Sequence, residues 1–422
     1  MLSTLAQRKR AREEEEEKTC RLCFRGEDDG PLVQPCACRG SAKWIHQHCL
    51  EQWRRKGPKE DAAYRCGECK DEYRDALSIE LLGARLQAKR TNGQATNFTL
   101  STLAVELQTQ GKYDEAETLF RELLEATRET LGSQHPDTLG SINNLGLLLK
   151  NKGNLAAAEL LLCEALEVSR ETLGDRHADT LTVINNLGML LEDKGDLAAA
   201  EPLCREAMKA QRETLGDRHP STLTSINNLG WLLKAKGDLA AAEPLLREAL
   251  EVSRETLGNR HPFTLNSVNN LSMLLKDKGD HAAAELLLCE ALEVQRETLG
   301  DWHPSTLTSI NNMGQLLHAK GDLAAAEPLL REALEVRRET LGDRHPDTLS
   351  SLNNLGVLLK DKGDLAAAEL LLCEALKGMR EILGKRHATT LIVTNNFARC
   401  AAEGQAQACF HAGPNPNRTH YT

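Results

Sequence analysis

Eight residues whose side chains bind soft metal ions lie in four close pairs near the start of the chain. Their spacing is C-x2-C, twelve residues, C-x-C, seven residues, H-x2-C, sixteen residues, C-x2-C, which gives Cys20, Cys23, Cys36, Cys38, His46, Cys49, Cys66 and Cys69. Structural zinc takes four thiolate or imidazole ligands in a closed tetrahedron. The eight residues therefore predict two structural Zn²⁺ ions, with no open coordination position for metal-based catalysis.

A disulfide framework is the alternative explanation for so many cysteines, and it requires an oxidising compartment. Residues 1–19 contain a short basic run and five successive glutamates, but no apolar core of a secretory signal. We therefore favour zinc over disulfides. His48 is a competing imidazole, but it adjoins Cys49, where both side chains can hardly reach one ion, so we expect His46 to be the ligand.

The ligand order of four Cys, one His and three Cys resembles the RING-CH finger of ubiquitin ligases. PHD fingers share this order, but the C-x-C pair and the seven-residue gap before His46 are similar to RING-CH, as are the runs Cys20-Arg21-Leu22-Cys23 and Trp44-Ile45-His46-Gln47-His48-Cys49. The resemblance implies interleaved ligands, with one ion on Cys20, Cys23, His46 and Cys49, and the other on Cys36, Cys38, Cys66 and Cys69. A segment with so few core residues would need the metal to fold.

The same resemblance implies docking of a ubiquitin-charged conjugating enzyme. The chain would then be a RING-type ubiquitin-protein transferase that forms no covalent intermediate and acts by proximity. The docking surface would include Leu22, Ile45 and Trp53, and Lys70 would add a contact to ubiquitin. For Trp53, packing against the finger's own small helix is the alternative.

The rest of the chain is dominated by a repeat of 42 residues. A His-Pro or His-Ala step marks its phase at His135, His177, His219, His261, His303, His345 and His387. Within one unit, Ile226, Leu229, Gly230 and Leu233 form one apolar stripe of a helix. Gly237 and Asp238 then supply a helix stop and an N-cap before a second helix. Pro202, Pro244 and Pro328 lie inside second helices, where we expect a local bend and no break.

This pattern of paired helices resembles the tetratricopeptide repeat, and its 42-residue period is similar to the longer version in kinesin light chains. The chain is thus expected to be mainly α: a small two-zinc cross-brace RING-CH finger followed by an all-α superhelical solenoid. We expect a charged arm at 1–18, the finger at 19–74, a helical linker and hinge at 75–98, seven helix pairs with a capping helix at 99–403, and a loose tail at 404–422.

A second stripe on each first helix predicts where a partner could bind. In tetratricopeptide proteins the first helices line the concave groove, and this stripe carries a recurring Asn followed by variable residues: Asn143, Asn185, Asn227 with Trp231, Asn269, Asn311 and Asn353. An amide can pair with both donors and acceptors of an extended peptide. The alternative is that Asn merely tolerates a wet groove wall. The repeated His are read as loop-packing residues, since copies one repeat apart cannot share a metal ion.

Composition restricts the partners. The net charge of −10 argues against non-specific nucleic-acid binding, and no apolar run reaches the ~18–20 residues of a membrane span. The scattered further cysteines fit reduced thiols in a cytoplasmic or nuclear protein. Two functions remain: a ubiquitin ligase whose solenoid recruits the protein substrate, or a non-catalytic zinc-binding scaffold that assembles partners on its repeats.

Overall fold

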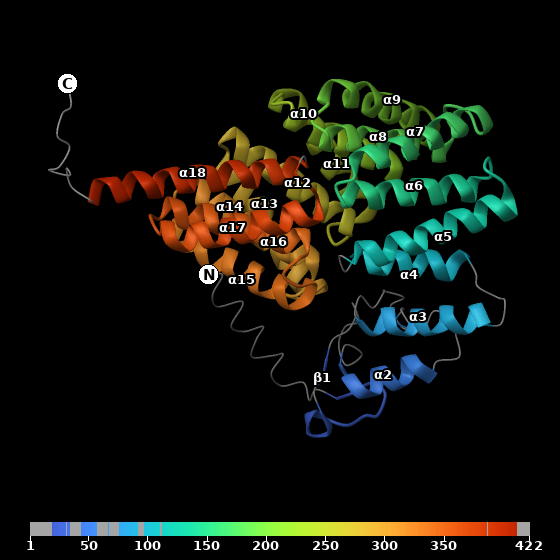
Figure 1. The fold of residues 1–422 in the computed structure, drawn as a ribbon, viewed down its shortest axis with the longest axis horizontal. Coiled ribbons are helices and arrows are strands. Elements are labelled where there is room, and N and C mark those ends of the chain that lie inside the picture. Colours follow the sequence, from blue (N-terminus) through green and yellow to red (C-terminus); the bar gives the residue numbers. More distant parts are fainter. Residues whose placement is uncertain are drawn as a thin grey trace, which may run out of the picture. The chain divides into compact units, whose positions relative to one another are not determined.

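The computed structural model describes residues 19–30, 32–33, 44–56, 66, 76–91, 97–109, 112–385 and 387–411. The chain divides into two compact units, Met1–Leu107 and Gln108–Thr422 (Figure 1). The expected arm at 1–18 and the last eleven positions of the expected tail lie outside the described residues.

The first unit contains a small finger built on a two-stranded sheet. A short 3-10 helix, Glu27–Asp29, precedes β1 (Leu32–Val33), which pairs antiparallel with β2 (Ile45–His46). Helix α2 (Gln47–Lys56) follows β2 directly. The finger core consists of Cys20, Ile45, Leu50 and Cys66, with Leu32 and Trp53 among the partly buried residues packed on it. So small a core is consistent with a fold that depends on bound metal.

Helix α3 (Ala76–Thr91) is fastened to the finger by two polar contacts. The Arg54 guanidinium of α2 donates to the Ser78 hydroxyl at 2.6 Å, and both side chains are fully buried. Beside this bond, Arg55 pairs with Glu80 at 2.7 Å. A buried guanidinium is costly without such partners. The helix that the sequence predicts after the finger is thus attached to it.

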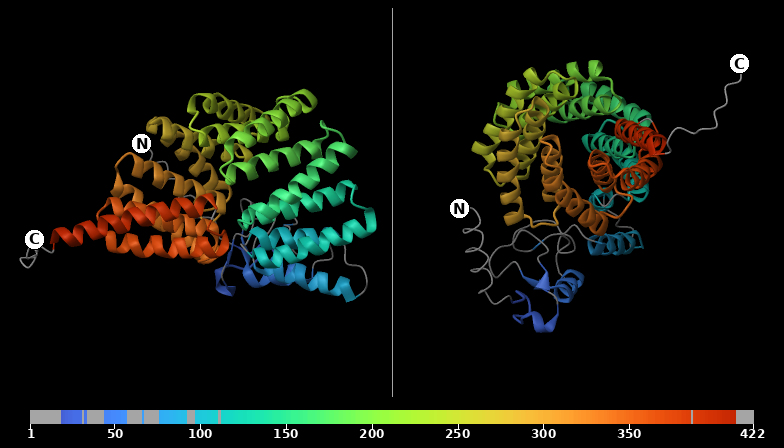
Figure 2. Two further views of the ribbon diagram at one scale, coloured as in Figure 1. Left: turned by 45° about the horizontal axis from the view of Figure 1, so that its top comes forward. Right: turned by 90° about the vertical axis from the view of Figure 1, so that its left-hand side faces the viewer.

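The second unit is a series of antiparallel helix pairs, which confirms the mainly α class. Helix α4 (Asn97–Thr109) crosses the boundary between the units. The helices that follow are α5 (Tyr113–Leu131), α6 (Pro136–Asn151), α7 (Leu155–Thr172), α8 (Ala178–Asp193), α9 (Leu197–Leu215), α10 (Pro220–Ala235), α11 (Leu239–Leu257), α12 (Pro262–Lys278), α13 (His281–Thr298), α14 (Pro304–Ala319), α15 (Leu323–Leu341), α16 (Pro346–Asp361), α17 (Leu365–Ile382) and α18 (Ala388–His411). From α5 to α18 each helix packs on the next one in sequence, and each even-numbered helix from α6 to α18 also packs on the next even-numbered one, so the pairs wind around a common axis (Figure 2).

Every even-numbered helix from α6 to α18 is started by its histidine. The Nδ1 atom of each repeated His accepts a hydrogen bond from the backbone N–H two residues later, at 3.1–3.2 Å. This contact satisfies one of the N–H groups that a helix start leaves open. The histidines that the sequence places in loops are therefore N-caps.

The other helix of each pair starts and packs as the sequence predicts. Asp238 caps α11 by accepting from the Ala241 N–H at 3.1 Å, directly after Gly237 at φ +82°. The two helices of a pair approach closely, because a Cβ on Gly230 would lie 2.8 Å from Leu246 Cδ2. Helices α9, α11 and α15 run unbroken through their internal prolines, as expected. Helix α18 continues to His411, past the expected end of the repeat region at 403, so the expected loose tail begins as helix.

Candidate metal centre and repeat groove

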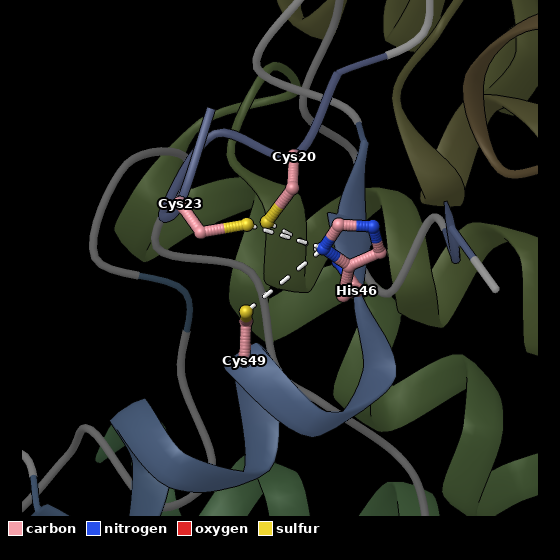
Figure 3. Close-up of side chains that lie close together, drawn as sticks. All are labelled: Cys20, Cys23, His46 and Cys49. Atoms are coloured by element: carbon pink, nitrogen blue, oxygen red, sulfur yellow. Dashed lines mark hydrogen bonds between the residues drawn. The ribbon is translucent and has the colours of Figure 1, made fainter. Parts of the chain in front are cut away.

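The structure brings together the four residues predicted to hold the first zinc ion. One ligand atom from each of Cys20, Cys23, His46 and Cys49 lies within 4.8 Å of all the others (Figure 3). Cys20 and Cys23 flank a tight turn, where the Phe24 N–H bonds the Cys20 carbonyl at 2.7 Å. His46 ends β2 and Cys49 lies in the first turn of α2. Three thiols and one imidazole in this arrangement fit the tetrahedral preference of structural zinc.

The orientation of His46 leaves one nitrogen for the metal. Its Nε2 lies 2.8 Å from the Gly26 carbonyl oxygen, to which it can only donate. Its Nδ1 then carries the free lone pair and faces the thiols, 3.2 Å from Cys23 Sγ and 3.9 Å from Cys49 Sγ. Such a backbone partner on the outer nitrogen is usual for metal-bound histidine. Nδ1 is therefore the atom that would bind a metal ion.

The pKa values of Cys20 and Cys49 are shifted in opposite directions. Burial raises the pKa of Cys20, but hydrogen bonds from the backbones of His46, Cys23 and Leu22 outweigh it and lower that pKa to about 6. Burial raises the pKa of Cys49 to about 12, together with the neighbouring Cys23 and Cys20. Three thiolates at one point repel one another, and a divalent cation removes that repulsion. The donor set therefore suits Zn²⁺.

His48 lies beside this cluster and outside it. Its Nε2 reaches Cys49 Sγ at 3.2 Å, and its ring stacks on His46 with centroids 5.1 Å apart. The side chain is exposed, whereas His46 is fully buried among the ligands. This geometry supports His46 as the ligand.

The second predicted ion site falls largely outside the described residues. Cys36, Cys38 and Cys69 belong to this remainder, as does Lys70. Cys66 is described: it is buried in the finger core, and Arg21 Nη2 lies 3.4 Å from its Sγ.

The three described docking candidates differ in exposure. Leu22 is 37% exposed, whereas Ile45 is 1% exposed and belongs to the finger core. Trp53 is half-buried and packs on that core, which was the alternative for it. Among the described docking candidates, Leu22 and part of Trp53 are thus accessible, whereas Ile45 lies in the finger core.

The repeated groove asparagines hydrogen-bond from one repeat to the next. All of them except Asn143 are buried. In four places the second Asn of a repeat donates to the first Asn of the preceding one: Asn186 to Asn143 at 2.8 Å, Asn312 to Asn269 at 3.4 Å, Asn354 to Asn311 at 3.0 Å and Asn396 to Asn353 at 2.9 Å. Among the described residues, the Oδ1 atoms of Asn185 and Asn227 are buried without a hydrogen-bond partner. Asn185 also donates to the Ser225 hydroxyl. Sequence reasoning missed these partners, whose signal is the recurring Asn-Asn pair. Peptide contact by the first Asn remains a prediction.

Next to the asparagines, the stripe predicted to line a partner groove carries charges that are partly neutralised. The Lys234 ammonium lies 4.6 Å above the Trp231 ring and 2.8 Å from an Asp277 oxygen. Trp231 also shares a side-chain hydrogen bond with Glu192, whose pKa burial raises. Burial lowers the pKa of Lys276, in the next first helix. This part of the predicted stripe therefore presents one aromatic ring, that of Trp231, with charged side chains around it.

Comparison with known families agrees with both parts of the chain. The tetratricopeptide repeat model matches residues 96–171, 143–203, 179–255, 233–297 and 305–381, which together cover more than half of the sequence. The chain is a tetratricopeptide-repeat protein. A RING-variant domain model matches residues 20–69, the segment that contains all eight predicted zinc ligands.

Curated relatives match only the finger. The E3 ubiquitin-protein ligase MARCHF5 of Xenopus laevis is 37% identical over 62 residues, which is 14% of this chain and 22% of that protein. The probable E3 ubiquitin ligase SUD1 of Arabidopsis thaliana is 44% identical over 62 residues, again 14% of this chain but 5% of that protein. The chain therefore spans less than a quarter of the length of these relatives.

Solved structures match the repeats. The Rap conjugation gene regulator of plasmid pLS20, in complex with the Phr* peptide, superposes with a TM-score of 0.56 at 16% identity over 70% of this chain and 77% of its own. A Podosopora anserina putative kinesin light chain with nearly identical repeats gives a TM-score of 0.43 at 27% identity over 49% of this chain and 97% of its own. The likeness to the Rap regulator shows the fold of the repeat region. Among the described helices, none has the length and apolarity needed to cross a membrane.

Proposed function

We propose that this chain is a RING-type ubiquitin-protein ligase whose repeats recruit the protein to be modified. The carrying observation is the cluster of Cys20, Cys23, His46 and Cys49, assembled inside a segment that matches the RING-variant domain and is similar to ubiquitin ligases. The repeats supply a separate protein-binding region. The described cysteines are free thiols, which supports a reducing, cytoplasmic or nuclear setting.

In this proposal the finger holds two structural zinc ions. Cys36, Cys38, Cys66 and Cys69 would bind the second ion. Zinc supplies folding energy here and takes no part in the transfer, because a closed tetrahedral site has no position for substrate. The chain's own residues then form a rigid face on which the charged conjugating enzyme rests.

Leu22 and Trp53 would contact the conjugating enzyme, with Ile45 supporting them from the core and Lys70 contacting ubiquitin. The contribution to transfer is positional, because a docked enzyme presents its thioester next to a substrate bound elsewhere on the same chain. In the proposed groove, half-buried residues one helical turn after the asparagines would contact the partner's side chains and select among them. These residues are Leu147, Met189, Trp231, Met273, Gln315 and Val357.

Ubiquitin-chain assembly in vitro tests the proposal. The full chain, its Leu22→Ala variant and its Trp53→Ala variant are incubated with activating enzyme, a panel of conjugating enzymes, ubiquitin and ATP. We expect chains from the wild type, and at least tenfold fewer from Leu22→Ala, because an exposed apolar contact of about 1.5 kcal/mol or more is lost. Zinc content should be unchanged in Leu22→Ala, which separates loss of docking from loss of folding.

The scaffold function is the competing outcome of this experiment. A wild-type protein that retains its zinc but produces no chains with any conjugating enzyme would reject the ligase. The finger would then be a protein-contact module, and the repeats would carry the function.

A further inference from the structure

Two turns of the second unit that are far apart in sequence lie against each other. A Cβ built on Gly153, in the α6–α7 turn, would overlap the backbone carbonyl of Leu383, which follows α17. Gly195 occupies the same position one repeat later with a similar φ, +80° against +76°, yet a Cβ there would meet nothing within 4 Å. Gly153 is therefore needed for a close approach as well as for its left-handed backbone.

A second contact joins the start of the unit to the start of α16. The His345 ring caps α16 through Nδ1 and also hydrogen-bonds the backbone of Thr109, in a sense that raises its pKa, so the ring is the donor there. Its side chain is 9% exposed, whereas the equivalent His135 and His177 are 41% and 44% exposed. His345 is thus covered, whereas His135 and His177 face solvent.

Two neighbours extend these contacts. Tyr113, at the start of α5, has its pKa raised to about 12 by burial and by the Asp347 carboxylate near the start of α16. His387, which caps α18, interacts electrostatically with Asp193 and Lys150, at the ends of α8 and α6. The last helices therefore return beside the first ones of the unit, as the view down the axis shows (Figure 2).

We propose that the repeat superhelix closes on itself and that these two contacts form a latch between its first and last repeats. The latch is defined by Gly153 with Leu383, and by His345 with Thr109. While closed, it fixes the curvature of the first helices between α6 and α16, which line the groove. A partner that needs a wider groove must first open the latch.

The size of the latch makes it reversible. It rests on a close approach of two backbones and on one side-chain hydrogen bond, whereas a stable protein interface buries ~1,200 Å² or more. Repeat proteins gain most of their stability from contacts between adjacent repeats. The latch can therefore open without unfolding the repeats, and it does not depend on ligase activity.

Hydrogen exchange on the full chain tests the first contact with a matched pair. Both Gly153→Ala and Gly195→Ala place a side chain on a left-handed residue, which costs each about 1 kcal/mol locally. Only Gly153→Ala introduces a clash with Leu383. We expect Gly153→Ala to speed exchange at least fivefold in the α17–α18 turn, and Gly195→Ala to leave that turn unchanged. Equal exchange at the α17–α18 turn in both variants would overturn the latch.

A second pair tests the other contact without removing a cap. Asparagine is a good N-cap, so His345→Asn and His177→Asn both keep the helix start while shortening the side chain. We expect His345→Asn to speed exchange around Thr109 and Tyr113 and to increase the radius of gyration in solution, and His177→Asn to do neither. If His345→Asn leaves both observables at their wild-type values, the latch is absent.

Discussion

At the scale of single residues, the finger offers a direct choice between two neighbouring imidazoles. His46 is buried, with Nε2 held by the Gly26 carbonyl and Nδ1 facing three thiols, whereas His48 is exposed beside Cys49. We expect His46→Ala to lose about one zinc ion per chain, because a structural site needs four ligands. His48→Ala should keep the wild-type zinc content, measured by atomic emission on the purified full chain. The reverse result would assign the ligand to His48.

The cap histidines predict how stability depends on pH. Burial lowers the pKa of His345 and of His387 in the folded chain below the ordinary value of 6.5. The unfolded chain therefore takes up protons first, so this contribution to stability is full above about pH 6.5 and is lost as the pH falls towards the folded pKa. A protonated ring also cannot accept the cap hydrogen bond at Nδ1.

His345→Asn removes one of these titrations and keeps a cap. Between pH 7 and pH 5 the free energy of unfolding of the wild type should fall more steeply than that of the variant. One proton accounts for at most about 1.4 kcal/mol per pH unit. Denaturant titrations at several pH values measure the difference, and parallel curves would contradict the assigned role.

The sequence of a single helix does not show which side chains the neighbouring repeat places against it. Helical periodicity correctly placed Asn143 and its equivalents on one stripe, but it does not show what the next repeat presents to that stripe. The structure shows the second Asn of the following repeat there, together with Ser225 or Ser309 in two places. The cluster of Cys20, Cys23, His46 and Cys49 was predictable because metal coordination requires close pairs that the sequence displays directly.

At the scale of elements, two helical glycines differ in how closely a neighbouring helix approaches them. Gly230 of α10 faces Leu246, so an added Cβ overlaps it, whereas Gly140 of α6 is exposed with open space around it. We expect Gly140→Ala to stabilise the repeats by about 1 kcal/mol through propensity alone. Gly230→Ala should instead destabilise them, because overpacking costs about 1–3 kcal/mol against the same gain. The midpoints of thermal unfolding give both signs, and a gain in both variants would refute the tight approach.

Most elements of the second unit were predictable because the 42-residue repeat displays their stripes and stops several times. The ends of the helices were harder to predict from the sequence. Periodicity does not reveal that the repeated histidines are caps, since a His side chain contacting the N–H two residues later is a matter of local geometry. Likewise, α18 continues to His411 because its alanine-rich continuation favours helix, although the apolar stripe has already ended.

At the scale of the whole molecule, adjacent repeats are joined by rows of ion pairs that the sequence pattern did not predict. Lys194 bonds Glu159 of the preceding repeat at 2.6 Å, and Arg170 bonds Glu206 of the next at 2.7 Å, with equivalents along the unit. Each exposed pair contributes up to about 1 kcal/mol, but a regular row fixes how one repeat sits on the next. Contacts such as that between Gly153 and Leu383 arise only when these small rotations add up over several repeats. For that reason no local pattern predicts them.

The central claim is that a metal-held finger and a repeat region act together as a ubiquitin ligase. Its most direct measurement is single-turnover discharge of ubiquitin from a charged conjugating enzyme, with the full chain at saturating concentration. We expect the wild type and His48→Ala to accelerate discharge. Leu22→Ala and His46→Ala should not accelerate it, and zinc should be lost only in His46→Ala. A zinc-loaded wild type that leaves the discharge rate unchanged for every conjugating enzyme that binds it would contradict the account.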